Sequence, residues 1–300
     1  MRSDKVAVFG VPTAAGDFAP GTERAPFALR QAGLLEALRA TGRRVVNLSD
    51  LSLFPFLDDP ENPRARNVAR VACAARAAAD EMTRAIQEGF TVALGGDCSI
   101  AAGTVGGARL ALGRPVGLVF IDANADLNTP ETSPSGRLCG MALALALGLG
   151  PEEVTSSGGS RPAVDPDHVA LVGYRALDPG ERGRLGDLGL ALPAIAGHAL
   201  GMRATAALAL DAVSNDDGPI VVHLDVDAID PSEMPAKAVL TPGPGLSGQE
   251  VSDLVTALVS SPRVVALEVV ELDPSKDPTG ACARRVVDLI ARALAYRVRG

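Results

Sequence analysis

The sequence predicts one α/β domain, residues 1–300, in which a mostly parallel central sheet lies between two layers of helices. Three observations support this fold class. Segments with strand character alternate with segments of helical periodicity along the whole chain, which is typical of parallel sheets. The expected strands are continuous apolar runs, as in strands that are covered on both faces. A length of 300 residues fits one large domain, and no repeat or low-complexity tract divides it.

The first half of the chain is expected to contribute four strands, at 5–10, 43–48, 90–94 and 115–121. Helices are expected at 25–41, 65–88 and 99–112. Pro26 suits the first turn of the first helix, and Gly42 and Gly89 suit the ends of the first two. The Pro- and Asp-rich segment 50–63 is expected to form a surface loop.

The second half is expected to contribute strands at 168–172, 219–224 and 264–270. Helices are expected at 141–147, 179–188, 199–214, 247–259 and 280–298. In a parallel sheet of this kind, ligands bind beyond the carboxyl ends of the strands. The residues that directly follow the expected strands are therefore the candidates for a functional site.

Composition excludes several classes of function. The net charge of −8 and the absence of a basic stripe argue against a nucleic-acid-binding protein. The N-terminal apolar run is too short for a signal peptide, and no stretch is long enough to span a bilayer. The four cysteines lie far apart without CxxC spacing, which favours a reducing, cytoplasmic location over a disulfide framework.

Two acidic runs follow expected strands, and they point to a metal site. In the run IDANAD, Asp122 and Asp126 flank Asn124, and in the run HLDVDAIDP, Asp225 and Asp227 lie two residues apart. Residues at i, i+2 and i+4 project from the same side of an extended chain. Like charges that converge on one point need a cation or shared protons. A divalent metal site explains this pattern better than helix caps or turns, in which Asp is also common.

Several long motifs then resemble the ureohydrolase family, which comprises arginase, agmatinase and their relatives. They cover nearly the whole chain in the family's order: GVPTAAGDFAPGTERAPFALRQAGLLEAL, LGGDCS, DANADLNTPETSPSGRLCG, GYRALDPGE, HLDVDAIDP and EVVELDPS. The motifs NTPETSPSG and DPGE are most similar to those of the arginase branch. The resemblance implies an arginase-like three-layer fold and two Mn²⁺ ions, with a hydroxide that attacks the guanidinium carbon.

The resemblance also implies roles for the acids. Asp122 and Asp225 would each bridge both ions, Asp126 would bind one, and Asp227 the other. Asp126 would in addition hold the attacking hydroxide by a hydrogen bond. Glu271, at the end of the last strand, would pair with the guanidinium group, for which a carboxylate is the natural partner.

The chain departs from the family where three histidines are expected. Cys98 and Asn124 stand where the family has metal ligands, and Cys139 stands where it has a proton shuttle. Asn124 would ligate a hard cation weakly, and Cys98 is either a ligand softer than Mn²⁺ prefers or a small buried thiol. Cys139 is either a filler or a proton donor. If both cysteines approach the metals, a Zn²⁺ site or a disulfide is an alternative.

The three histidines of this chain fall outside those positions, at 168, 198 and 223. His223 lies inside an expected strand and is interpreted as a satisfied core histidine, not as a ligand.

The amino-acid end of the site is better preserved. Asn128, Ser133 and Ser135 match positions that hold the α-carboxylate in arginases, and Asp178 matches the residue that holds the α-amino group. Arg137 replaces a smaller polar residue beside the carboxylate. The loop 235–242 also departs in length from the family's pattern.

These observations support two hypotheses. The first is a metal-dependent hydrolase that cleaves the guanidino C–N bond of arginine or of a modified arginine such as N-hydroxyarginine. Its products would be ornithine plus urea or hydroxyurea, and the family implies a homo-oligomer, a trimer or a hexamer. The second is a metal-poor arginase-like pseudoenzyme that binds an amino acid or acts as a regulator. The loss of three histidines together motivates the second hypothesis.

Overall fold

The structure, a computed structural model, describes residues 4–214, 217–237 and 239–297 and has one eight-stranded sheet. The order of its strands is β2-β1-β3-β8-β7-β4-β5-β6, and every neighbouring pair is parallel. The strands are β1 (Lys5–Val11), β2 (Arg44–Asp50), β3 (Phe90–Gly95), β4 (Gly117–Ile121), β5 (Val169–Tyr174), β6 (Leu190–Pro193), β7 (Ile220–Asp225) and β8 (Val264–Val270). The predicted α/β class with a parallel central sheet is confirmed.

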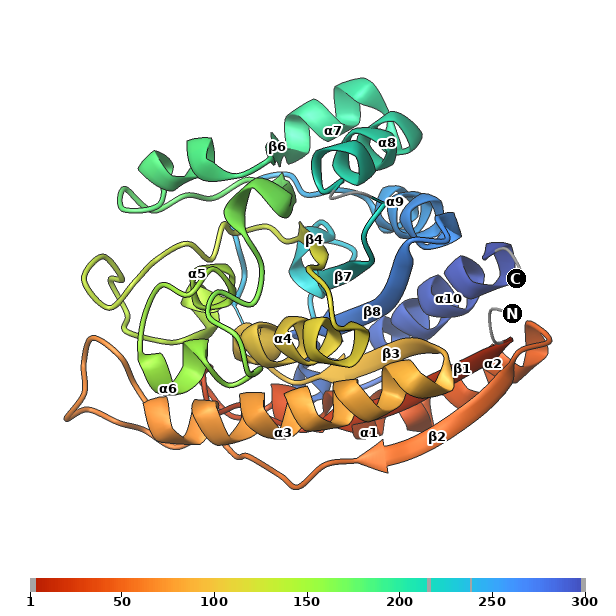
Figure 1. Cartoon of the computed structure of the whole chain (residues 1–300). Helices are drawn as coiled ribbons and strands as arrows, with labels where there is room; N and C mark the ends of the chain where they lie inside the picture. The colour runs from red at the N-terminus through yellow and green to blue at the C-terminus, as the bar shows by residue number, and fades with distance from the viewer. Residues whose placement is uncertain (1–3, 215–216, 238, 298–300) are drawn as a thin grey trace.

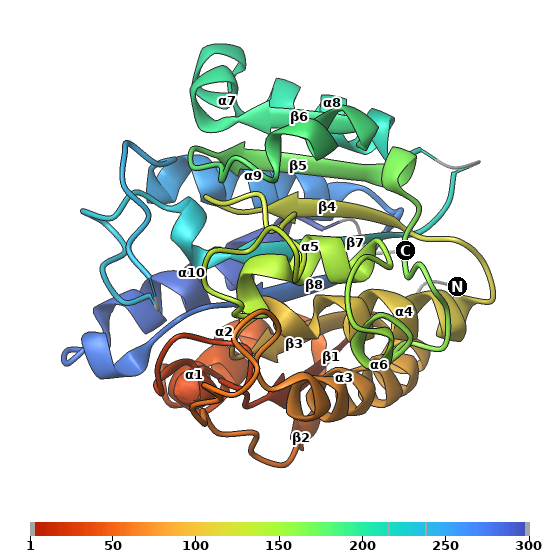
Figure 2. The same ribbon diagram turned by 90° about the vertical axis from the view of Figure 1, so that its left-hand side faces the viewer.

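Helices cover both faces of the sheet, which makes three layers (Figure 1). One face is covered by α3 (Val68–Glu88), α4 (Ala101–Leu112) and α5 (Ala142–Ala146), with the short α6 (Glu152–Thr155) beside them. The other is covered by α1 (Ala25–Gln31), α2 (Leu34–Ala40), α7 (Ala194–Leu200), α8 (Met202–Ala212), α9 (Gly248–Ser260) and α10 (Ala281–Tyr296). Figure 2 shows the strands stacked one above another, from β6 at the top to β2 at the bottom.

The central strands are buried on both faces, which explains why they appear as apolar runs without alternation. Every residue of β3, β4 and β7 is buried. Along β4, Leu118 and Phe120 pack in the core beneath α3, α4 and α5, whereas Val119 and Ile121 pack in the opposite core. Strict alternation along a strand therefore places Asp122, two residues after Phe120, on the α3 side of the sheet.

Two predicted helices are each interrupted by a glycine. The helix expected at 25–41 is divided into α1 and α2, because Gly33 has a φ of 90°. The helix expected at 199–214 begins earlier, at Ala194, and is divided into α7 and α8 by Gly201, whose φ is 79°. Positive φ values of this kind are readily adopted only by glycine, and they end an α-helix.

Two further elements differ from the prediction. The helix expected at 179–188 is only a 3₁₀ helix, Arg182–Asp187, in which Gly183 and Gly186 disfavour a regular α-helix. The short edge strand β6 was not predicted. It ends in a proline, a residue that is tolerated at sheet edges. The last helix is α10, and Val298, its predicted end, lies outside the described residues.

None of the helices in the described parts of the chain is both long and apolar enough to cross a membrane.

Candidate metal and substrate site

A cavity of about 330 Å³ lies beyond the carboxyl ends of the central strands β3, β8, β7 and β4, which are neighbours in the sheet. Most of the predicted site residues line it: Cys98, Asn124, Asp126, Asn128, Ser133, Ser135, Cys139, Asp178, Asp225, Asp227 and Glu271. Asp122 is fully buried beside these residues, because it lies on the first position after β4.

Cys98 connects two acids that come from neighbouring strands. It opens a 3₁₀ helix, Cys98–Ile100, just after β3. Its Sγ lies 3.2 Å from Asp225 Oδ2, and its backbone N–H donates a hydrogen bond of 2.9 Å to Glu271 Oε1. The thiol therefore lies among the carboxylates, as the resemblance predicts for this position, even though histidine is absent.

Backbone hydrogen bonds orient the second acidic pair. Asp225 Oδ1 accepts a hydrogen bond of 2.6 Å from the N–H of Asp227, and Asp227 Oδ1 accepts one of 3.0 Å from the N–H of Ala123. Asp227 Oδ2 accepts from Thr241 Oγ1 (2.8 Å) and from Asn124 Nδ2 (3.1 Å). The ends of β7 and β4 are thus joined through one carboxylate, and Asn124 faces it as an amide donor.

Asp122 has one oxygen without a partner. Its Oδ1 accepts a hydrogen bond of 2.7 Å from the N–H of Asn124, whereas its Oδ2 has no hydrogen-bond partner within the described structure. Asp126 and Glu271 both adopt positive φ values, 51° and 67°. Such conformations cost about 1–3 kcal/mol in residues other than glycine and cluster at functional sites.

Three groups of side chains offer ligand atoms that lie within 4.8 Å of one another: Cys98, Asp122 and His223; Cys98, Asp225 and Glu271; and Asp122, Asp225 and Asp227. Among the described residues, Asp126 joins none of these groups, although it lines the same cavity. The unpartnered oxygen of Asp122 and the convergence of carboxylates fit a divalent cation.

Burial is the main influence on the ionisation of these acids. It raises the pKa of Asp122, Asp126 and Asp225 well above the usual range, and the negative charges of their neighbours raise it further. The pKa of Glu271 is raised in the same way, by burial first and then by Asp17 and Asp225. Four such acids cannot all ionise together without a compensating positive charge.

Two cationic side chains lie close to the acids, and one of them is Arg175, whose Nη2 donates a hydrogen bond of 3.0 Å to the backbone oxygen of Asp227. The other, Lys237, is fully buried, and its Nζ donates a hydrogen bond of 3.3 Å to the backbone oxygen of Asp227. Burial lowers the pKa of this amine, while the charge of Asp227 raises it. These two cations offset only part of the negative charge of the cluster.

The residues expected to form an amino-acid clamp, Asn128, Ser133, Ser135 and Asp178, line the same cavity. Asn128 Nδ2 donates a hydrogen bond of 2.8 Å to Asp178 Oδ2, and Asn128 Oδ1 accepts one of 3.0 Å from Thr132 Oγ1. Ser133 Oγ accepts from the N–H of Gly136 (2.9 Å), and Ser135 Oγ accepts from the N–H of Arg137 (3.2 Å). The two hydroxyl oxygens also lie 3.5 Å apart, where either can donate to the other, so at least one hydroxyl proton remains for a bound carboxylate.

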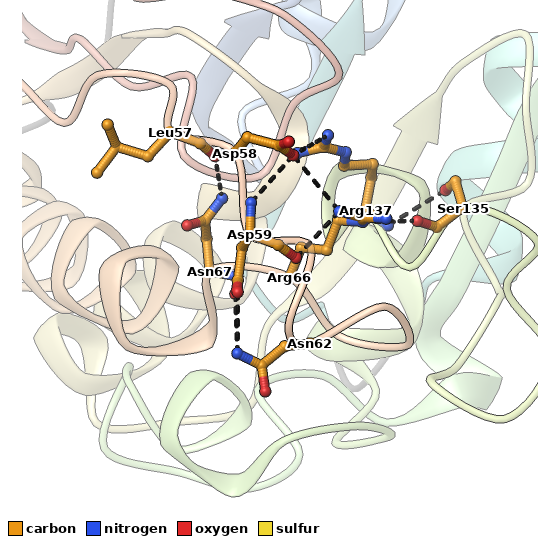
Figure 3. Close-up of polar contacts among 8 residues, drawn as sticks. All are labelled: Leu57, Asp58, Asp59, Asn62, Arg66, Asn67, Ser135 and Arg137. Carbon is orange, nitrogen blue, oxygen red and sulfur yellow. Dashed lines mark hydrogen bonds and ion pairs between the residues drawn. The ribbon is translucent and has the colours of Figure 1, made fainter.

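Residues 133–136, called the serine loop below, include the two clamp serines. Arg137 directly follows this loop and does not line the cavity. Its Nη2 lies 3.3 Å from Asp58 Oδ1 (Figure 3). Its guanidinium group also covers the ring of Phe56, with Cζ 5.1 Å from the ring centroid. Arg66 also reaches Asp58, and its Nε donates to the backbone oxygen of Ser135 (3.2 Å). Arg137 therefore helps to attach the loop 51–67 to the serine loop.

All four cysteines are free, so the structure contains no Cys98–Cys139 disulfide. Cys139 is buried and lines the cavity. Burial raises its pKa well above the ordinary value, and Asp17 and Glu271 raise it further. At neutral pH its side chain is consequently a neutral thiol and a weak acid.

With this geometry established, comparisons with known proteins agree on one family. The sequence profile of the arginase family matches residues 4–296. The chain belongs to the arginase family. It is 32% identical to an arginase of Bacillus caldovelox over 291 residues, which covers 95% of this chain and 96% of the relative. It is also 32% identical to an arginase of Bacillus subtilis over 299 residues, with 98% of both chains covered.

Solved structures of this family share the fold. The crystal structure of the arginase from Bacillus subtilis superimposes with a TM-score of 0.86 at 31% identity, and 97% of this chain and 98% of that one are covered. The structure of the Entamoeba histolytica arginase in complex with L-ornithine superimposes with a TM-score of 0.87 at 27% identity, over 98% of this chain and 99% of that one. The predicted resemblance is confirmed, and the protein is an arginase-family hydrolase.

Three residues of the site were missed or misjudged from the sequence. Glu181 is buried at the clamp, where its carboxylate accepts from the N–H of Leu127 (3.0 Å) and of Asp178 (2.7 Å). Glu181 is the last residue of the DPGE motif, which begins with Asp178, so the same motif could have identified it. Lys237 lies in the loop whose length departs from the family's pattern. His223 is a core histidine as predicted, but it is only half satisfied, because its Nε2 has no partner within the residues described.

Proposed function

We propose that this arginase-family hydrolase cleaves the guanidino C–N bond of an arginine-like α-amino acid. The observation that carries the proposal is that one cavity is lined both by converging carboxylates and by the residues expected to hold the α-amino and α-carboxylate groups. The ornithine complex of the Entamoeba histolytica relative supports an α-amino acid as the ligand class.

The proposed metal ligands are Asp122, Asp126, Asp225 and Asp227, with weaker contributions from Cys98 and Asn124. The proposed cofactor is a pair of Mn²⁺ ions, with Zn²⁺ as the alternative. Bound divalent ions would supply hydroxide at neutral pH by lowering the pKa of water. The acids at the ends of β4 and β7 would hold the ions, and their mutual repulsion would fall as the ions bind.

The remaining residues would bind and orient the substrate. Glu271 would pair with the guanidinium group, since its carboxylate lies in the cavity next to the metal ligands. Asp178 would accept from the α-ammonium group, and Asn128, Ser133 and Ser135 would donate to the α-carboxylate. Arg137, for which the resemblance implies a place beside the α-carboxylate, would act on it through the position of the serine loop.

The altered chemistry at position 139 favours a substrate with a less basic tail. Cys139 is a buried thiol whose raised pKa makes it a poorer proton donor than an imidazolium ion. The hydroxyguanidine of N-hydroxyarginine carries less fixed charge than a guanidinium ion, so its carbon is attacked more easily. The proposed reaction on that substrate yields ornithine and hydroxyurea, and arginine itself would yield ornithine and urea.

A turnover assay tests this function. Arginine, N-hydroxyarginine, agmatine and guanidinobutyrate should be incubated with the protein and added Mn²⁺, and ornithine, urea and hydroxyurea measured. The expected result is the highest kcat/KM for N-hydroxyarginine. Turnover of none of these compounds at any metal loading would refute the hydrolase.

The second candidate is a metal-poor pseudoenzyme that binds an amino acid or a partner, and the replacement of three histidines favours it. Metal analysis of the purified protein separates the two. Stoichiometric Mn²⁺ or Zn²⁺ supports the hydrolase, whereas sites that remain empty after dialysis against either ion support the pseudoenzyme.

We further propose that residues 1–300 form a single domain, that the protein is cytoplasmic, and that it assembles into a trimer or a hexamer like the family it belongs to. Four free cysteines support a reducing compartment. Light scattering on the purified chain would determine the oligomer.

A further inference from the structure

His223 is a buried histidine in the middle of β7 with one ring nitrogen engaged and the other unpaired. Its Nδ1 lies 2.5 Å from Glu268 Oε1. Its Nε2 has no hydrogen-bond partner in the described parts of the chain. Since a carboxylate accepts, Nδ1 is the nitrogen that donates to Glu268, which leaves Nε2 as the nitrogen that could bind an ion.

Three adjacent strands hold the ring in place. His223 pairs in register with Phe120 of β4 on one side and with Glu268 of β8 on the other. The rings of Phe120 and His223 stack with centroids 4.1 Å apart and planes 4° apart. Phe120 fixes the plane of the imidazole ring. Glu268 binds Nδ1, so Nε2 is the nitrogen that points away from Glu268. A carboxylate behind a histidine is the usual support of a metal-binding imidazole.

The ring lies close to two further side chains that can bind a metal. His223, Asp122 and Cys98 offer atoms within 4.8 Å of one another, and all three side chains are buried. The second oxygen of Asp122 is also without a partner within the described structure. Two residues of this group thus each have an unpaired buried atom, which is unusual in a protein interior unless an ion or a water joins them.

We propose that Cys98, Asp122 and His223 form a mixed sulfur, oxygen and nitrogen site for a divalent ion of the zinc type, with Glu268 as its positioning residue. The proposal rests on the metal centre of the proposed function, and it adds a ligand and a class of metal to that centre. It does not depend on which substrate is hydrolysed.

The donor set determines the class of metal. Zn²⁺ binds thiolate, imidazole and carboxylate with distances of about 2.0–2.3 Å, usually with four ligands. Such distances place neighbouring ligand atoms roughly 3.3–3.8 Å apart, so shifts of about 1 Å in side-chain position would close the observed group around an ion. Mn²⁺ prefers oxygen donors and gains little from a thiolate. Asp225, whose Oδ2 lies 3.2 Å from Cys98 Sγ, is placed to supply the fourth ligand.

X-ray absorption at the zinc edge of the full-length protein, loaded with one equivalent of Zn²⁺, tests the ligand set directly. The wild-type protein should show one sulfur and one imidazole in the zinc shell. Cys98→Ser should lose the sulfur, and His223→Gln should lose the imidazole. His198→Gln is the matched control, because His198 forms a similar imidazole–carboxylate pair with Glu250 (2.7 Å) on the surface. A wild-type zinc shell without imidazole would overturn the proposal, whether or not the variants fold.

Competition calorimetry with Zn²⁺ and Mn²⁺ tests the preference for metal. His223→Gln should weaken Zn²⁺ binding by about 100-fold, and Glu268→Gln by roughly 10- to 100-fold, with a smaller loss for Mn²⁺ in both variants. Equal losses for the two metals would overturn the preference. A protein that binds metal without His223 leaves the proposed hydrolase intact, whereas a protein that binds neither metal removes the hydrolase as well.

Discussion

Asn128 and Asp178, fifty residues apart in the sequence, are joined by a hydrogen bond of 2.8 Å from Nδ2 to Oδ2, and both line the cavity. The pair connects the loop after β4 with the loop after β5, and Glu181 supports it through the N–H of Asp178. The orientation of both side chains is therefore set before any ligand arrives. Preorganised groups of this kind bind a ligand with a smaller entropic cost.

Asp178→Ala should raise KM for arginine-like amino acids roughly 10- to 100-fold, because a hydrogen bond to a charged group contributes about 1.5–3 kcal/mol. The change in kcat should be smaller, since the α-ammonium group is bound equally in the ground state and in the transition state. Guanidinobutyrate, which lacks that group, provides the control, and its kcat/KM should change little. An unaltered KM for every amino-acid substrate would remove Asp178 from the site.

Gly136→Ala should disturb the serine loop. The φ of Gly136 is 67°, and a Cβ there would lie 2.0 Å from the backbone oxygen of Pro63. We expect a loss of at least about 2 kcal/mol in unfolding free energy and a higher KM, because Ser133 and Ser135 lie in the same loop. Urea denaturation and steady-state kinetics measure the two effects. Gly186→Ala is the matched control, since its Cβ would meet no atom within 4 Å.

Cys98→His and Asn124→His, which restore the family's residues, should each tighten Mn²⁺ binding by roughly tenfold, because imidazole is a better ligand than an amide or a buried thiol for this ion. Isothermal calorimetry measures the affinity. Asn124→Ala is the control at the second position and should not tighten binding. Equal Mn²⁺ affinity in all these variants would show that neither position faces the metals.

Lys237→Met should strengthen the binding of a divalent ion by roughly tenfold, since it removes a buried positive charge that repels the ion. In the metal-free protein the same substitution should lower stability at neutral pH, because the acids lose a nearby cation. Thermal unfolding with and without a chelator measures both effects. If Lys237→Met weakened metal binding, the main effect of the amine would be to hold the metal ligands in position, through its hydrogen bond to Asp227, and not to repel the ion.

The strands and the acids were predictable because both follow from local pattern. Strand 264–270 was predicted with the residues that the structure shows, and the apolar run before Asp122 proved to be the buried strand β4. The acids after β4 and β7 meet because the carboxyl ends of neighbouring parallel strands share one edge of the sheet. Gly33 and Gly201 were missed as helix breaks, since single glycines also occur inside helices.

The environment of His223 was not predictable from the sequence, since it depends on cross-strand register. Phe120 and Glu268 flank the ring only because β7 lies between β4 and β8, an order that the sequence does not reveal. Lys237 was missed for a related reason. A lysine in a loop is ordinarily exposed, and only the path of this loop over the ends of the strands buries it.

Asp17→Asn should flatten the dependence of stability on pH. Asp17 is buried at the cavity, with Oδ1 2.6 Å from the N–H of Phe18 and Oδ2 2.8 Å from Thr22 Oγ1, and burial followed by the charge of Asp97 raises its pKa to about 7.

Because this folded-state value lies above the usual 3.8 of an unfolded chain, the folded protein binds the proton more tightly. The resulting stabilisation is complete below about pH 4 and is lost as the pH rises through about 7. The amide of the variant would stay neutral at every pH. The free energy of unfolding of the variant, relative to that of the wild type, should therefore rise between about pH 4 and pH 7, by at most about 4 kcal/mol. Urea unfolding of the metal-free protein between pH 5 and pH 8 measures the gain, with Asp80→Asn on the exposed side of α3 as the control. A constant difference between wild type and variant across this range would mean that Asp17 is already ionised at pH 5.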